Sequence, residues 1–194
     1  MLARTNRCPW AERDELCRKY HDEEWGVPQE DDRRLFELLV LEGAQAGLSW
    51  HTILHKRDAY REAYSDFDPR IVAAFGEDTI KALLGNTRIV RHRLKIRSSV
   101  VNAQAFLAVQ KEYGSFSQFL WKFTGGVIKN HWGSSERVPS SSPISEALSK
   151  ALRMRGFQFV GPTICYSYLQ ASGRIVDHLT TCFLYPATDR STFH

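Results

Sequence analysis

The sequence predicts an all-α protein, and three observations support that fold class. Apolar residues recur at helical spacing, as at Leu35, Leu38 and Leu39, which share one face on a period of 3.6 residues. Capping residues precede several such runs, and no run shows the strict alternation of a half-buried strand. The chain has 194 residues, of which 43% are hydrophobic and 12% aromatic. We therefore expect one compact domain over residues 1–194 with a sizeable core.

Capping residues and helix breakers divide the first part of the chain into short helices. Asp31 or Asp32 is a natural N-cap for one helix, and Ser49 can cap the next. Gly76 and Gly85 separate the shorter segments that follow. The helices expected from these signals span residues 12–20, 31–45, 50–64, 69–75, 77–84 and about 88–113. The last begins with the basic run 88–97, which is either an ordinary solvated face or a surface for phosphate contacts.

The second part of the chain predicts a surface loop and then a helical hairpin. Residues 124–143 are rich in glycine, serine and proline and break the periodicity. Residues 144–172 indicate a helix, a tight turn and a second helix. Pro162 suits the first position of that second helix, and Gly161 precedes it. Its free N–H groups would attract an anion, and Arg153 and Arg155 add positive charge nearby.

Charge and cysteine content limit the function classes. The formal net charge is +4 and the isoelectric point is near 8.9, which permits nucleic-acid binding without demonstrating it. No run of eighteen apolar residues occurs, and the first residues lack the hydrophobic core of a secretion signal. We expect a soluble cytoplasmic protein with no membrane partner. The four cysteines do not form a disulfide framework at this length, so metal binding or burial is expected.

The stretch LEGAQAGLSW, residues 41–50, carries an acid on an apolar helix face. Glu42 lies three, four and seven residues after leucines, so its carboxylate points toward the core. Glu37 is turned roughly 140° away from that face, and we expect it to be solvated. A buried carboxylate costs several kcal/mol unless it is paired or protonated. Glu42 is therefore either paired for structural reasons or used chemically, and the small residues after it leave room for a flat ligand.

Aromatic residues are concentrated near the N-terminus. Trp10, Tyr20 and Trp25 lie within sixteen residues of one another, with His21 between them. Each ring separately is explained by core packing. Together with an inward acid, the set also suits a pocket that stacks on a nucleobase.

Three motifs carry a resemblance to a known family. They are YHDEEWGVP, LEGAQAGLSW and RGFQFVGPTICYSYLQASG, and the similarity extends from about Cys8 to about Tyr185. The chain resembles the DNA-3-methyladenine glycosylase I family of the helix-hairpin-helix DNA glycosylase superfamily. The resemblance implies hydrolytic excision of N3-methylated adenine from double-stranded DNA by base flipping. It also implies a monomeric enzyme whose partner is DNA that contains alkylated bases.

The resemblance assigns roles to residues of the pocket and of the DNA surface. Glu42 would be the catalytic acid that binds the adenine edge, in a dry pocket where Coulomb attraction to the cationic base is strong. Leu48 would insert into the space that the flipped nucleotide vacates. The base would stack among Trp10, Tyr20, Trp25 and Trp50. The residues expected to contact DNA are Gly47, Leu48, Arg153, Arg155, Gly156, Gly161 and Thr163.

The resemblance also implies one structural zinc ion per chain. His178 and Cys182 are four residues apart and could face one ion from a helix turn, and Cys8 and His21 form a distant second pair. All four coincide with the zinc ligands of the family. The ion would join a subdomain made of residues 1–30 and 173–194. Four protein ligands leave no water to activate, and the absence of a closely spaced trio of cysteines disfavours an iron–sulfur cluster.

Two departures leave alternatives open. Cys17 stands where the family tends to carry a tyrosine, which bears on the range of lesions. Asp177 lies where related glycosylases keep a catalytic aspartate, and it could instead orient His178. Besides 3-methyladenine excision, the alternatives are a glycosylase for a bulkier lesion and a DNA-binding module without catalysis. A zinc deaminase is excluded, because the required H-x-E and P-C-x-x-C motifs are absent.

Overall fold

The computed structural model describes residues 6–185, and within that range it is mostly helical, as the sequence predicts. No helix in this range is both long enough and apolar enough to cross a lipid bilayer. The α-helices are α1 (Glu15–Glu23), α2 (Asp32–Gln45), α3 (Trp50–Leu54), α4 (Arg57–Ala63), α5 (Pro69–Ala73), α6 (Glu77–Gly85), α7 (Arg93–Tyr113), α8 (Phe116–Thr124), α9 (Pro143–Met154) and α10 (Pro162–Ala171). The 3₁₀ turns are Pro9–Arg13, Ser65–Phe67 and Ser135–Arg137, and the strands are β1 (Ile128–Lys129) and β2 (Ile175–Val176).

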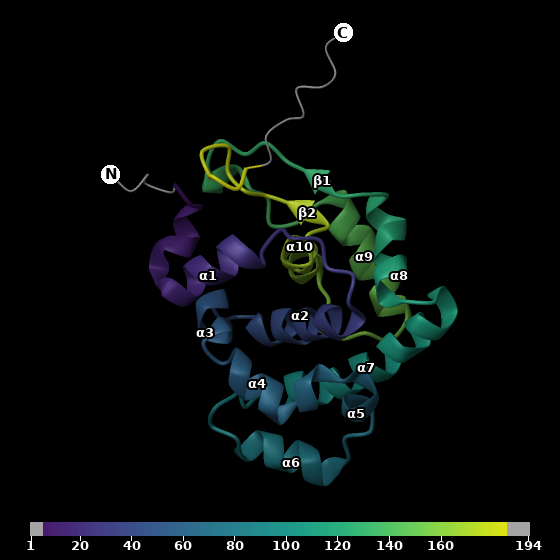
Figure 1. The fold of residues 1–194 in the computed structure, drawn as a ribbon. Coiled ribbons are helices and arrows are strands. Elements are labelled where there is room, and N and C mark those ends of the chain that lie inside the picture. Colours follow the sequence, from purple (N-terminus) through teal and green to yellow (C-terminus); the bar gives the residue numbers. More distant parts are fainter. Residues whose placement is uncertain (1–5, 186–194) are drawn as a thin grey trace.

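Helix α2 lies at the centre of the fold (Figure 1). It packs against α3, α7, α8 and α10, and every residue from Leu35 to Ala44 is buried. A helix that is covered on all sides cannot keep a polar face in solvent. Its acidic residues must therefore find partners inside the protein or be neutralised.

The predicted caps of α2 and α3 are confirmed. The Asp31 carboxylate accepts a hydrogen bond from the backbone N–H of Arg34 at 2.9 Å. The Ser49 hydroxyl accepts one from the backbone N–H of Thr52 at 3.2 Å. Each cap satisfies a donor that has no partner within its own helix, so local sequence fixes where both helices begin.

Three of the predicted helices differ from the observed ones. A 3₁₀ turn and a cap at Asp14 precede α1, so that helix begins at Glu15 and not at residue 12. The segment 50–64 is two helices, because the chain turns at His55 and Lys56. The basic run contributes only its second half to α7, which begins at Arg93 after an N-cap at His92. Helix periodicity does not reveal such single-residue breaks.

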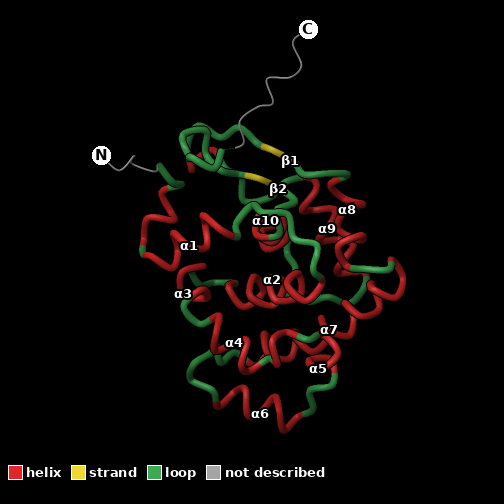
Figure 2. The backbone as a smooth tube through the Cα atoms, in the orientation of Figure 1, coloured by secondary structure: helices red, strands yellow, loops and turns green. Residues whose placement is uncertain are grey.

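Helix α8 and the strands β1 and β2 were not predicted. Helix α8 follows an N-cap at Ser115 directly after α7. The strands β1 and β2 pair in parallel, with Ile128 opposite Ile175, at the edge of the helical body (Figure 2). A pair of two-residue strands is too short to leave an alternating pattern. It nevertheless connects the predicted loop to the chain after α10.

Helices α9 and α10 form the predicted hairpin. Ser142 and Ser145 make a reciprocal capping box at the start of α9, and Gly161 is the N-cap of α10, with Pro162 in the first turn. The chain reverses at Gly156, whose φ of +87° is readily adopted by glycine. The hairpin geometry is therefore set by local residues of the turn.

A close approach at Gly173 gives a prediction about stability. A Cβ atom on this residue would lie 2.2 Å from the carbonyl carbon of Val27, and its φ is +67°. Gly173→Ala should lower the free energy of unfolding by on the order of 3 kcal/mol, because overpacking and backbone strain add. Chemical denaturation measures this loss. Gly85→Ala is the matched control, since a Cβ there meets open space, and equal losses in both variants would contradict the steric explanation.

Candidate functional site

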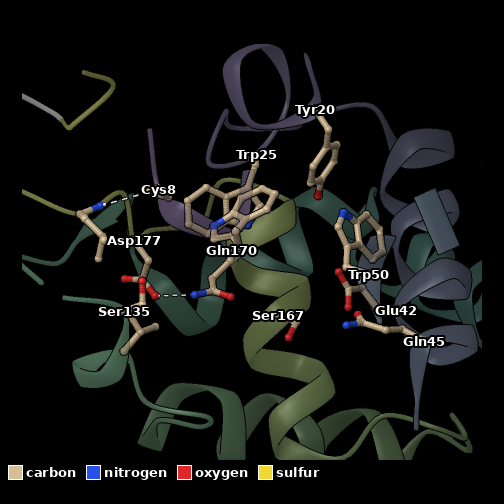
Figure 3. Close-up of a pocket in the computed structure, with 13 residues that line it drawn as sticks. Cys8, Tyr20, Trp25, Glu42, Gln45, Trp50, Ser135, Ser167, Gln170 and Asp177 are labelled. Carbon is tan, nitrogen blue, oxygen red and sulfur yellow. Dashed lines mark hydrogen bonds between the residues drawn. The ribbon is translucent and has the colours of Figure 1, made fainter. Parts of the chain in front are cut away.

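A cavity lined mostly by apolar side chains lies between α1, α2, α3 and α10. Its volume is about 300 Å³, at the small end of cavities that bind small ligands. Figure 3 shows Tyr20, Trp50 and Glu42 on one side of it and Trp25, Gln170 and Asp177 on the other. The lining residues are Cys8, Trp10, Tyr20, Trp25, Glu42, Gln45, Trp50, Ser135, Val138, Ser167, Gln170, Asp177 and Leu179.

Four aromatic rings form much of the cavity wall. The rings of Trp10 and Trp25 are 5.2 Å apart at a steep angle. Those of Tyr20 and Trp50 are also 5.2 Å apart, and Trp10 lies 6.2 Å from Tyr20. Such tilted and edge contacts are favourable for aromatic pairs. They hold flat apolar surfaces around a space in which a planar ligand can lie.

Glu42 brings a carboxylate into this cavity without a counter-charge. Its residue is only 4% exposed, and its side chain makes no hydrogen bond to any other described residue. Burial raises the pKa of Glu42 from its ordinary 4.5 to about 8, because the charged form loses its hydration. At neutral pH the ligand-free protein therefore keeps Glu42 mostly protonated.

Tyr20 and Trp50 each bring an unsatisfied donor to the same cavity. The Tyr20 hydroxyl and the Trp50 indole N–H are buried and have no hydrogen-bond partner in the described part of the chain. A buried donor without a partner costs about 1–3 kcal/mol. Two such donors beside Glu42 indicate that a ligand with polar edges completes the cavity.

Glu37 is the reverse case, and the prediction that it is solvated is wrong. Its side chain is buried, and its oxygens accept hydrogen bonds from Arg34 at 2.6 Å, Arg57 at 2.9 Å and Arg61 at 2.8 Å. These guanidinium groups more than offset desolvation, so the pKa of Glu37 is lowered. The ion pairs connect α2 to α4. Glu37 is a structural carboxylate, whereas Glu42 remains available to a ligand.

Asp177 lines the cavity, but its lone pairs are occupied. One oxygen accepts hydrogen bonds from Asn130 and Trp132, and the other from Tyr166 and Gln170, at 2.6–2.8 Å. Two carboxylate oxygens offer about four acceptor sites, so none is free for a water molecule. None of these partners is His178, so the idea that the Asp177 carboxylate orients that ring is wrong. Its position indicates a structural role.

A second cluster lies beside the cavity and joins both ends of the described chain. The donor atoms of Cys8, His21, His178 and Cys182 lie within 4.8 Å of one another, and all four residues are buried. The His178 Nδ1 atom is 3.9 Å from the Cys8 sulfur and 3.7 Å from that of Cys182. The His21 Nε2 atom is 3.5 Å from the Cys182 sulfur. This arrangement could hold a metal ion.

The cluster differs from the prediction in its backbone. Residues 177–182 are not helical, so His178 and Cys182 converge through a turn. Burial raises the pKa of the Cys8 thiol to about 12 and lowers that of His178 to about 4. Without a cation, the thiol therefore stays protonated and the imidazole neutral. Residues 1–5 and 186–194 of the expected subdomain lie outside the described residues.

The residues expected to contact DNA lie in the loop between α2 and α3 and in the hairpin, at its turn and at the adjacent ends of α9 and α10. Gly47 has a φ of +77° with open space around it, and Leu48 after it is 43% exposed. In the hairpin, the Arg153 guanidinium lies near Gly161, 3.6 Å from the position of a Cβ on that residue. Thr163 is exposed in the first turn of α10.

Arg155 does not fit the prediction of a free phosphate ligand. Its guanidinium donates hydrogen bonds to the Tyr113 hydroxyl at 2.7 Å and to Glu112 at 3.2 Å. It also lies over the ring of Phe119, 5.2 Å from its centroid. These contacts are made by residues distant in sequence, so the basic character of the turn did not reveal them. Arg155 fastens the hairpin to α7 and α8.

Helix α7 holds both loops from one of its faces. The Lys95 ammonium donates to the carbonyls of Ala44 and Ala46 at 2.8 and 2.6 Å, at the end of α2. Asn102 exchanges hydrogen bonds of 2.9 and 2.8 Å with the backbone of Gln158 in the hairpin turn. Lys95 and Asn102 are seven residues apart and share a helix face. The relative position of the two loops is thus fixed by one helix.

Several cavity residues were missed by the sequence reasoning. Ser167 and Gln170 lie on α10, three residues apart and therefore on one face. Polar residues on a largely buried helix were the available signal. Gln45, Ser135, Val138 and Leu179 follow no local pattern and reach the cavity through the fold. The five predicted base-binding residues, Trp10, Tyr20, Trp25, Glu42 and Trp50, all line it.

Comparison with known proteins gives consistent matches. The family model described as methyladenine glycosylase matches residues 10–185. DNA-3-methyladenine glycosylase 1 of Escherichia coli (strain K12) is 45% identical over 181 residues, which cover 93% of this chain and 97% of that protein. The DNA-3-methyladenine glycosylase of Haemophilus influenzae is 45% identical over 179 residues, 92% of this chain and 97% of that protein.

Solved structures agree with these matches. A crystal structure of 3-methyladenine DNA glycosylase I has a TM-score of 0.91 and 49% identity, and the match covers 93% of this chain and 100% of that one. A tyrosine-to-phenylalanine variant of 3-methyladenine DNA glycosylase I in complex with 3-methyladenine has a TM-score of 0.90 and 38% identity, with 94% and 98% coverage.

The burial of Glu42 predicts a pH dependence of stability. Between about pH 5 and pH 8 the folded protein retains a proton that the unfolded chain has lost, so stability falls as the pH rises. Glu42→Gln has no proton to lose there. Relative to the wild type, it should gain on the order of 3 kcal/mol across this window. Denaturation at several pH values measures the difference, and a difference that does not change with pH would contradict the raised pKa.

Proposed function

The chain belongs to the methyladenine glycosylase family, and we propose that it hydrolyses the N-glycosidic bond of 3-methyladenine in double-stranded DNA, as a monomer. The nucleotide would leave the base stack and enter the aromatic cavity. Water would form a bond to C1′ as the C1′–N9 bond breaks, and the electron pair of that bond would pass to the base. The proton of the water would pass to solvent.

The observation that carries this proposal is the set of unpaired groups in the cavity. Among residues 6–185, Glu42, the Tyr20 hydroxyl and the Trp50 N–H have no hydrogen-bond partner, and the flat rings beside them leave a space of about 300 Å³. A flipped purine offers polar edges to such groups and two faces for stacking. A DNA-binding module without catalysis would have no use for unsatisfied donors at this depth, so the cavity favours an enzyme.

Charge complementarity explains the preference for a methylated base. Adenine methylated at N3 is cationic while it is attached to deoxyribose, so it is already a good leaving group. A nearby cation favours the ionised form of a carboxyl group, so the base would draw the proton from Glu42. In a dry cavity the resulting attraction is stronger than in water. An unmodified adenine gains no such interaction.

Lesion size is limited by the cavity and not by Cys17. The Cys17 side chain is not part of the cavity lining and packs in a small cluster with Tyr20 and Leu54. The presence of cysteine in place of the family's tyrosine therefore leaves no opening in the wall. This favours 3-methyladenine over the alternative of a bulkier lesion.

We also propose that the four-residue cluster binds one structural zinc ion. Cys8, His21, His178 and Cys182 provide two sulfur and two nitrogen donors, which is a common ligand set for structural zinc. Zinc would replace the thiol protons and connect the two ends of the described chain. With four protein ligands there is no open position, so the ion would supply no catalytic water.

The two loops held by α7 are the proposed DNA surface. The N–H groups at the start of α10 have no partner within the helix, and the helix dipole makes that end positive. A phosphate can bind there beside Arg153, as in a helix-hairpin-helix element. The exposed Leu48 would then occupy the gap left by the flipped nucleotide.

Comparison of Glu42→Gln with Asp177→Asn tests the mechanism. Glu42→Gln removes the charge and should lower single-turnover excision by roughly tenfold to a hundredfold, equivalent to about 1–3 kcal/mol. Asp177→Asn replaces an acceptor by an amide donor, so it should mainly destabilise the protein. Excision of 3-methyladenine from duplex DNA is measured at equal folded fraction. Loss of activity only in Asp177→Asn would make Asp177 the catalytic acid.

Arg153→Ala tests the hairpin. Loss of a phosphate contact should weaken binding to all duplexes alike, and it should reduce the slope of log affinity against log salt by about 1. Lys81→Ala is the control, because Lys81 is an exposed cation on α6. Fluorescence anisotropy over a range of salt concentrations measures both. An unchanged salt slope in Arg153→Ala would rule out this contact.

A further inference from the structure

A second group of metal-binding side chains lies where α1 meets α3, apart from the cluster at the chain ends. Asp14 is the N-cap of α1 and Cys17 is in its first turn, while His51 is in α3. The carboxylate oxygen, the sulfur and an imidazole nitrogen of these residues all lie within 4.8 Å of one another. Three different kinds of donor therefore converge on one point.

A fourth donor stands beside them. The same oxygen of Asp14 is 2.6 Å from the Nε2 atom of His51 and 2.7 Å from that of His55. The two imidazole rings are 4.5 Å apart, because His51 and His55 are separated by one helical turn. Two imidazoles that share one carboxylate oxygen are positioned to share a cation with it.

Burial gives this group an inner and an outer side. Cys17 is 2% exposed, whereas the side chains of His51 and His55 are 29% and 48% exposed. Burial, and then the Asp14 carboxylate, raise the pKa of the Cys17 thiol to about 11. The thiol is therefore unreactive by itself. An ion that enters from the side of the histidines would meet the sulfur as its deepest ligand and displace the thiol proton.

We propose that Asp14, Cys17, His51 and His55 form a second zinc site, which fastens α1 to α3. One thiolate, two imidazoles and one carboxylate are all zinc ligands and suit tetrahedral coordination. Calcium and magnesium prefer oxygen donors, so this set disfavours them. The binding of the ion does not depend on the proposed enzymatic function.

The location gives the site a consequence for the cavity. Helix α1 carries Tyr20 and α3 carries Trp50, and the buried donors of both residues have no hydrogen-bond partner in the part of the chain that the structure describes. Their rings touch at 5.2 Å, and no covalent bond joins the two helices. An ion held between Asp14, Cys17 and His51 would fix this pair of rings in place. Zinc occupancy would thus regulate the rigidity of one cavity wall.

Metal stoichiometry tests the site. Metal-free protein is dialysed against a buffered micromolar concentration of free zinc, and bound zinc is measured by elemental analysis. The wild type should hold about two zinc ions per chain, and Cys17→Ser and His51→Gln about one each, by the logic of one ion per four-ligand set. Cys165→Ser is the control, because it removes a buried thiol outside both clusters and should keep both ions. A wild type that binds a single ion, with Cys17→Ser unchanged, would overturn the proposal.

A measurement on the wild type covers the case in which a variant fails to fold. Anomalous diffraction at the zinc edge, on crystals of the zinc-dialysed protein, should show a peak bonded to the Cys17 sulfur and the His51 Nε2 atom. Density at the cluster of Cys8 and Cys182 with none at Cys17 would overturn the second site. Density at Cys17 only would support this site and contradict the zinc proposal for the other cluster.

Discussion

The burial of α2 from Leu35 to Ala44 is the constraint on which the rest of the structure depends. A charge in this buried part of the helix must be paired or neutralised inside the protein, and the segment carries two carboxylates, Glu37 and Glu42. Three arginines donate hydrogen bonds to Glu37 and stabilise its ionised form, and two of these ion pairs join α4 to the core. Glu42 pairs with none of the described arginines, and desolvation favours its protonated form. One helix thus uses the same side-chain type for two opposite purposes.

The unpaired polar groups of the cavity make the ligand-free protein less stable. An unpaired acid and two donors without partners are unfavourable in the ligand-free protein, and the surrounding hydrogen bonds maintain them. Asp177 shows how, because its four hydrogen bonds tie α10 and the loop after β1 to the cavity wall. A ligand that pairs the unsatisfied groups recovers this energy on binding. Functional sites commonly depart from the local rules that the rest of a fold obeys.

The sequence predicts the parts of the structure that depend on local patterns. Caps at Asp31 and Ser49 and the hairpin follow from residues a few positions apart, and the face of Glu42 follows from periodicity. Periodicity shows on which side of a helix a residue lies, but it does not show what covers that side. The prediction that Glu37 is solvated is wrong because its side of α2 is also buried. Arg155 and Asp177 have partners in distant segments, which no local sequence pattern predicts. The family resemblance grouped the four candidate metal ligands, whereas spacing indicated only the pair His178 and Cys182.

The cavity wall combines segments that are synthesised at different times. It includes Cys8 from one end of the described chain and Leu179 from the other, and the backbone N–H of Leu179 points at the Cys8 sulfur at 3.4 Å. A ribosome delivers the first of these residues long before the second. Until the segment around Leu179 has been made, part of the cavity wall is missing. The complete cavity can therefore form only after the chain has been synthesised at least as far as Leu179.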